Sequence, residues 1–246
     1  MTASLAVRDK AAPVFTHGSL IRHVAVMTAT GAVGLMAAFS VDLLSLYWVS
    51  QLGDQAYKAA IAYVGLVFFV AISISIGLTI AVSATVSRAL GAGDRPRARR
   101  LASSALLITG LISAAVTGVM FVFREQGLAS ILHAKGEPLE VAAHFLAISL
   151  PSNVLMAIGM ALSGVLRAVG DARRAMYVTL SGAVVTAFLD PLLIFGLGLG
   201  VYGAAWATVV SRLCFVIVGW HGAIRIHNMA ARPSLKAALQ DAAREG

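Results

Sequence analysis

Two aspartates and one arginine interrupt long apolar runs of this sequence, where a charged side chain is expensive. Asp42, Asp190 and Arg212 each lie within a stretch made mostly of Ala, Val, Leu, Ile and Gly. A charge at the centre of a membrane helix costs about 2.5–3.5 kcal/mol on insertion scales, so such a residue is a functional candidate by default. The short carboxylates predict a site for a proton or a small cation. The long stem of Arg212 favours instead a structural ion pair or a guanidinium that reaches the membrane interface.

The residues around Asp190 offer further oxygen ligands. Pro191 has no N–H to donate to the carbonyl of Ala187, and its ring pushes that carbonyl aside. Irregular backbone inside a membrane is tolerated only against protein, water or a bound ion. The hydroxyl of Thr186 lies one turn before Asp190 on the same helix face. The stretch TAFLDP therefore predicts an oxygen-rich pocket at a disturbed helix, which is how broken transporter helices hold Na⁺ or H⁺.

The expected depths bring three helices to this pocket. Asp190 and Thr208 each lie seven residues from the outer end of their helix, about 10 Å at 1.5 Å per residue, and Asp42 lies ten residues, about 15 Å, from its own. Both aspartates also lie on stripes of small residues, which let membrane helices approach closely. The stripes are Gly31, Gly34, Ala38, Asp42 and Ser45, and Thr179, Gly182, Ala183, Thr186, Ala187 and Asp190. Both aspartates are therefore expected to face protein or a cavity.

The elements that must position these residues follow from composition. The 246 residues are 59% hydrophobic and 12% charged, with a mean hydropathy of +0.86, whereas soluble domains are about 25% charged. Such a chain must contact lipid. Spanning helices need about 20 mostly apolar residues, and membrane β-strands are about half as long. Six runs qualify as helices, which predicts an all-α bundle: 24–52, 59–86, 101–123, 141–166, 175–197 and 201–221.

Basic residues predict the orientation of this bundle. All but four of the 19 Lys and Arg fall on one side of the six spans, which the positive-inside rule makes cytoplasmic, so both termini are expected there. The same rule explains the net charge of +8 without a nucleic-acid partner. Residues 91–94 spell the GxGD of intramembrane aspartyl proteases, but Asp94 is expected in an Arg-rich cytoplasmic loop, so no enzyme is predicted.

Four ordered motifs resemble the N-terminal lobe of a multidrug and toxic compound extrusion (MATE) transporter. They are AFSVDLLSLYWVSQLGDQA, VSRALGAGDRPRARR, LRAVGDARRAM and LDPLLIFGLGLGVYGAAWAT, and together they cover nearly the whole chain. The resemblance implies twelve helices in two six-helix lobes that exchange Na⁺ or H⁺ for amphipathic, often cationic, drugs. It also implies a cation site in this lobe, with Asp42 and Asp190 as ligands of Na⁺. The implied cation-binding residues are Asp42, Thr186, Asp190 and Thr208.

The sequence departs from the family at three points. Thr186 stands where the family often has Asn, and Met27 stands where many members have a proline. The chain also stops where the interlobe linker would begin. Residues 1–227 are therefore expected to form one lobe, and residues 228–246 a basic cytoplasmic tail or a truncated interlobe linker.

These features together predict a cation-coupled antiporter in a bacterial inner membrane, with Na⁺ or H⁺ as the coupling ion and no cofactor. Its expected partners are a small amphipathic or cationic substrate, the lipid bilayer, and a second lobe or a second copy in a homodimer. One alternative is a lipid-linked precursor flippase of the same superfamily, whose cationic cavity only Arg212 could begin. Another is a non-transporting half-transporter that acts as a partner or assembly module.

Overall fold

The described part of the chain, residues 20–229 of the computed structural model, is built from helices alone. Six of its segments are long and apolar enough to cross a membrane, and the fourth consists of α5, η1 and α6 in line. The predicted all-α bundle with six spans is therefore confirmed. The elements are α1 (Leu20–Ser50), α2 (Gln55–Gly91), α3 (Arg95–Val122), α4 (Arg124–Ser130), α5 (Glu137–Ser149), η1 (Leu150–Ser152), α6 (Asn153–Ala168), α7 (Ala172–Pro191), η2 (Leu192–Gly196), α8 (Val201–Trp220) and η3 (His221–Ile226).

Several helices continue beyond the apolar runs that predicted them. The second span extends to Gly91, past Arg88, and the third begins at Arg95, six residues before the predicted start. The α3 helix starts there because the side chain of Asp94 accepts a hydrogen bond of 2.9 Å from the backbone N–H of Arg97. Hydropathy marks the part of a helix that lies in hydrocarbon, whereas caps set where the helix ends. The predicted tail, 228–246, lies outside the described residues except for its first two, and the extent of the predicted lobe stays a prediction.

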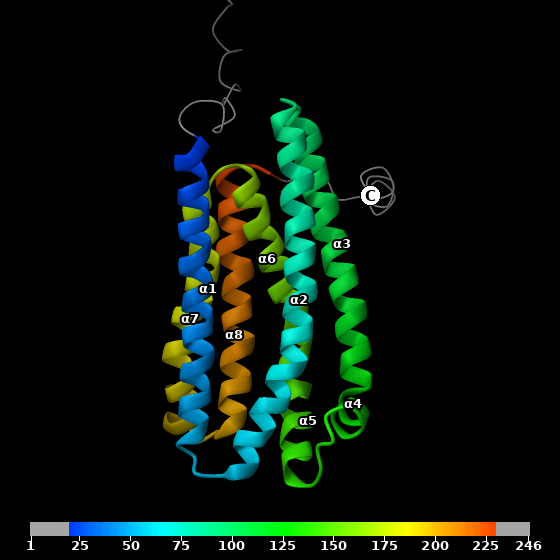
Figure 1. Ribbon diagram of the computed structural model, residues 1–246, viewed down its shortest axis with the longest axis vertical. Coiled ribbons are helices and arrows are strands. Elements are labelled where there is room, and N and C mark those ends of the chain that lie inside the picture. Colours follow the sequence, from blue (N-terminus) through cyan, green and yellow to red (C-terminus); the bar gives the residue numbers. More distant parts are fainter. Residues whose placement is uncertain (1–19, 230–246) are drawn as a thin grey trace, which may run out of the picture.

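The helices lie nearly parallel, with α1 and α3 at opposite edges of the bundle (Figure 1). The α7 helix packs against both α1 and α8, while α6 packs against α2, α3 and α8. In Figure 1, α1 begins at the end of the bundle that also carries the α2–α3 and α6–α7 turns, and η3 ends there. We call this the Arg-rich end. The α1–α2 and α7–α8 turns lie at the opposite end.

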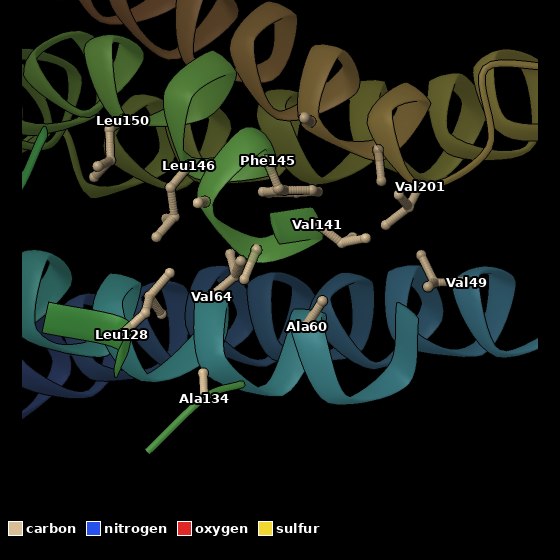
Figure 2. Packing of buried hydrophobic residues seen from close by; sticks show 14 of the residues in the cluster. Val49, Ala60, Val64, Leu128, Ala134, Val141, Phe145, Leu146, Leu150 and Val201 are labelled. Atoms are coloured by element: carbon tan, nitrogen blue, oxygen red, sulfur yellow. The ribbon is translucent and has the colours of Figure 1, made fainter. Parts of the chain in front are cut away.

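Two apolar clusters hold the bundle together, one near each end. The cluster toward the opposite end joins α1, α2, α4, α5, η2 and α8, and Figure 2 shows its side chains filling the space around α5. It contains Val49, Ala60, Val64, Leu128, Ala134, Val141, Phe145, Leu146, Leu150, Ile194 and Val201, among others. The cluster toward the Arg-rich end is centred on α6 and includes Leu162, Val165 and Leu166. The α5–η1–α6 span therefore contributes to both clusters and is the central helix of the fold, which we call the central post.

A polar cluster ties the chain after α8 to the α6–α7 turn at the Arg-rich end. Asp171 caps α7 by accepting a hydrogen bond of 3.1 Å from the backbone N–H of Arg174, and it also accepts one from the Arg174 guanidinium. The His227 ring lies 2.8 Å from the same carboxylate. The carbonyl of His227 in turn accepts a hydrogen bond of 3.1 Å from Arg95 at the start of α3. Three segments that are distant in sequence thus meet at Asp171 and His227.

Replacing Asp171 with Ala should lower the free energy of unfolding by about 1–3 kcal/mol, since the change removes a helix cap and two charge-assisted hydrogen bonds. Burial raises the pKa of Asp171, but the hydrogen bonds from His227 and from the backbone and side chain of Arg174, with the Arg174 charge, bring the pKa below its ordinary value of 3.8. The stabilisation that ionised Asp171 provides is therefore complete above about pH 4, and it is lost as the pH falls through the lowered pKa.

Thermal unfolding in detergent between pH 7 and pH 3 would measure this difference. The wild type and the variant should differ most near neutral pH and converge in acid. Glu125→Ala is the control, because Glu125 forms only an exposed pair with Arg124 and should change stability by less than about 1 kcal/mol. A stability difference that stays constant down to pH 3 would contradict this account of Asp171.

Candidate cation site

Asp190 is the most deeply buried carboxylate in the described part of the chain. It lies at the end of α7 with 1% of its surface exposed. One carboxylate oxygen, Oδ2, accepts a hydrogen bond from the hydroxyl of Ser45 on α1. The other, Oδ1, is buried and has no hydrogen-bond partner among the described residues. An unpaired buried carboxylate oxygen is costly. A bound proton or a small cation would satisfy it.

The helix beneath Asp190 widens where Pro191 interrupts its hydrogen bonds. The chain does not stop at the proline but passes into a π-helical turn, η2, which ends with a hydrogen bond of 2.9 Å from the N–H of Leu197 to the carbonyl of Leu192. Single π-turns of this kind are rare and occur frequently at functional sites. The disturbance expected at Pro191 is thus a widened turn directly after Asp190.

The next helix approaches this widened turn very closely at Gly203 of α8. A Cβ atom at Gly203 would lie 2.7 Å from the carbonyl carbon of Leu193 and 2.8 Å from the N atom of Ile194, both in η2. Only glycine lets the two backbones pack at this distance. A second close approach joins α1 to α7, where a Cβ atom at Gly34 would lie 2.5 Å from the hydroxyl of Thr179. Small residues therefore hold α7 against both neighbours.

The other three predicted ligands lie on the helices that meet at Asp190. Asp42 is on α1, three residues before Ser45, and its side chain is exposed. Thr186 is partly buried on α7. Thr208 lies on α8, where its hydroxyl donates to the carbonyl of Ala204 at 2.9 Å. Within residues 20–229, no hydrogen bond joins any of these three to Asp190.

Ser45 is the partner of Asp190 that the predicted ligand set omits. It belongs to the same stripe of small residues as Asp42, so the pattern contained its signal. The hydroxyl is available because α1 packs mainly against α7 and turns this face toward it. The hydrogen bond between Ser45 and Asp190 is a direct polar link between the two helices that carry the predicted aspartates.

Arg212 is buried, so the alternative in which its guanidinium reaches the membrane interface is wrong, while the alternative of a structural role holds, with neutral partners in place of an ion pair. Its side chain is 5% exposed, and its Nη1 donates hydrogen bonds of 3.0 Å to the carbonyl of Ser149 and to the hydroxyl of Ser152. The guanidinium also lies 4.5 Å from the centre of the Phe68 ring, a cation–π contact. Both acceptors lie at η1, where the α5–α6 span is irregular, and the Ser149 carbonyl also accepts a hydrogen bond of 2.6 Å from the Ser152 hydroxyl. Arg212 therefore fastens α8 to the central post and does not line an open cationic cavity.

Replacing Arg212 with Ala should lower the free energy of unfolding by about 3 kcal/mol, through lost charge-assisted hydrogen bonds and an unfilled volume. Arg212→Met fills most of that volume and relieves the cost of a buried charge, so it should lose less than half as much. Thermal unfolding in detergent would compare the two variants. Equal losses would show that the hydrogen bonds outweigh both the packing and the buried charge.

The comparison with known proteins agrees with this architecture. The MatE family model matches residues 32–192, which include Asp42, Ser45 and Asp190. The chain belongs to the MatE family. Among its relatives, the FAD transporter of Shewanella oneidensis is 32% identical over 213 residues, covering 84% of this chain and 46% of that protein. The multidrug export protein MepA of Staphylococcus saprophyticus is 26% identical over 207 residues, with the same two shares.

Solved structures of MatE transporters have the same fold. An outward-facing multidrug resistance MATE family transporter of the MOP superfamily matches with a TM-score of 0.80 and 26% identity, covering 92% of this chain and 51% of that one. The Vibrio cholerae MATE transporter VcmN in its bent form also gives 0.80 and 26%, covering 89% and 50%. This MatE chain thus spans about half the length of its relatives, as expected for one lobe, and is a multi-pass membrane protein.

Proposed function

We propose that this MatE chain forms the N-terminal lobe of a cation-coupled antiporter and that Asp190 binds the coupling ion, Na⁺ or H⁺. The observation that carries the proposal is the buried carboxylate of Asp190, which has one oxygen bonded to Ser45 and the other without a partner in the described residues. A proton would neutralise the Asp190 carboxylate, and a desolvated Na⁺ would be coordinated by that oxygen. Asp42, Thr186 and Thr208 complete the oxygen set when α1, α7 and α8 close around the ion, with Asp42 the second carboxylate for Na⁺.

Coupling requires the ion to distinguish two packings of the helices. The bond from Ser45 to Asp190 joins α1 to α7, and η2 against Gly203 joins α7 to α8. An ion at Asp190 competes with Ser45 for the carboxylate and draws the exposed Asp42 inward. The packing of α1 against α7 therefore depends on whether the ion is bound. A substrate that favours the ion-free packing would then be exchanged for the ion.

The substrate is expected to be small and amphipathic or cationic, as the name of the multidrug export relative suggests. The relative named as an FAD transporter points to a second candidate substrate, an aromatic dinucleotide. Of the two relatives, it has the higher sequence identity to this chain. A lipid-linked precursor is less favoured, since Arg212 is already bonded to Ser149 and Ser152.

A second six-helix body is expected to cover α1. Only 6% of the residues in the most apolar part of α1 are buried, and the exposed side of the helix carries Asp42. A carboxylate in mid-membrane is costly against lipid, so this face should line a water-filled cavity between two bodies. The second body is either another lobe or a second copy of this chain, within a bacterial inner membrane. Without transport, the same surface would serve a half-transporter that acts as an assembly partner.

The proposal is tested by reconstituting the chain in liposomes loaded with a fluorescent cationic dye. An imposed Na⁺ or proton gradient should accelerate dye movement against the direction of ion flow, and one of the two ions should be required. Size measurement in detergent accompanies the assay. A monomer that moves no dye under either gradient would favour the non-transporting alternative.

A further inference from the structure

A small cavity lies between α2 and α3 at the Arg-rich end, away from the cation site. Its volume is about 80 Å³, and it is lined by Thr85, Arg88, Ala89, Ala92, Arg97 and Leu101. Two arginines from two different helices thus border one hollow, and no acidic residue lines it. The side chain of Arg88 has no hydrogen bond or ion pair among the described residues, whereas Arg97 has other contacts within the chain. The positive-inside rule accounts for arginines in a loop, but it does not account for a cavity between them.

We propose that this cavity, which we call the Arg88 pocket, binds the headgroup phosphate of an acidic phospholipid. Guanidinium groups match phosphate oxygens with paired hydrogen bonds, and basic pockets between membrane helices on the cytoplasmic side bind such headgroups. The Arg88 pocket has this composition, and α3 begins beside it, so the positive end of the helix dipole adds to its attraction for an anion.

The position of the pocket favours a lipid over free phosphate. Ala89 and Leu101 give it an apolar floor, which suits the glycerol region of a lipid and offers nothing to a hydrated ion. Ala81 lies two turns from Arg88 toward the membrane centre, on the same face of α2, and is exposed, so an apolar surface leads from the pocket into the hydrocarbon. A headgroup held by Arg88 and Arg97 would therefore have its acyl chains in the bilayer. This proposal does not depend on transport.

Native mass spectrometry of the full chain, titrated with cardiolipin, phosphatidylglycerol or phosphatidylcholine, tests the Arg88 pocket. The two acidic lipids should bind more tightly than phosphatidylcholine. The double variant Arg88→Gln/Arg97→Gln should weaken cardiolipin binding about thirtyfold, because two arginines near an anionic surface act together. Ala92→Glu, which keeps both arginines but places a carboxylate in the cavity, should weaken it at least about tenfold.

The control is Arg173→Gln/Arg225→Gln, which removes the same charge from exposed positions outside the pocket. It should change cardiolipin binding less than about threefold. Equal losses in the two double variants would overturn the proposal, because general surface charge would then explain the binding. Unchanged binding in both Arg88→Gln/Arg97→Gln and Ala92→Glu would also overturn it. So would displacement of cardiolipin by inorganic phosphate at equal concentration, which would show a site for a free anion.

Discussion

Replacing Asp190 with Asn should lower cation-driven efflux at least about tenfold while the six-helix bundle stays folded. Asn has the shape of Asp and can still accept the hydrogen bond from Ser45, but it cannot take up a proton or hold a cation by charge. Hydrogen bonds and contacts to charged groups contribute about 1.5–3 kcal/mol, which corresponds to a tenfold or greater loss of ion binding. The measurement is the initial rate of dye efflux from liposomes under the gradient that drives the wild type.

The matched control for this variant is Asp54→Asn. Asp54 caps α2 by accepting a hydrogen bond of 2.7 Å from the N–H of Ala56, and Asn is an equally good cap. This control makes the same chemical change outside the site and should keep full coupling. If Asp190→Asn also keeps full coupling, Asp190 does not bind the driving ion. If both variants lose activity with lowered thermal stability, the effect lies in folding and not in coupling.

Replacing Gly203 with Ala should lower the free energy of unfolding by about 2–3 kcal/mol and disturb transport as well. The added methyl group would meet the backbone of Leu193 and Ile194 at 2.7–2.8 Å, where no flexible side chain can move aside. Overpacking of this kind costs about 1–3 kcal/mol and displaces the backbone. The displaced segment is η2, which begins two residues after Asp190. The temperature of thermal unfolding and the rate of dye efflux should therefore both fall.

Gly65→Ala separates this effect from the general effect of replacing a helix glycine. A Cβ atom at Gly65, inside α2, would have no atom within 4 Å. The alanine should therefore leave stability unchanged or raise it by up to about 1 kcal/mol. A stability loss at Gly203 no greater than that at Gly65 would mean that α8 and η2 have room to separate.

The number and type of the helices could be predicted from hydropathy, because lipid contact imposes an apolar run of fixed length. The short helix α4 and the irregular turn η1 could not, since neither lies in a run of its own. The end of α2 and the start of α3 could not be predicted either. Both helices extend beyond the hydrocarbon into the polar segment around Asp94, which caps α3. Hydropathy carries no information on that part of a helix.

The site was predictable in part for a related reason. Asp190 and Pro191 are conspicuous in an apolar run whatever surrounds them, so composition alone was enough to make them candidates. The partner of Asp190 depends on the rotation of α1 about its axis, and that rotation is set by contacts such as Gly34 with Thr179. Sequence spacing placed Asp42 and Ser45 on one face but could not say which of them meets α7. The partners of Arg212 could not be predicted, because they lie at η1, an irregular turn that the apolar run of the fourth span does not reveal.

The packing of α1 has a consequence for how the protein is made. This helix is synthesised well before its main partner α7, which begins about 120 residues after α1 ends. At ribosomal rates of about 5–20 residues per second, α1 waits roughly 6–24 s in the membrane before that partner emerges. During this interval the apolar side chains of α1 must retain it there against the cost of Asp42, without the contacts that α7 later supplies. The aspartate is thus carried by a helix that must stay in the bilayer before its main partner is present.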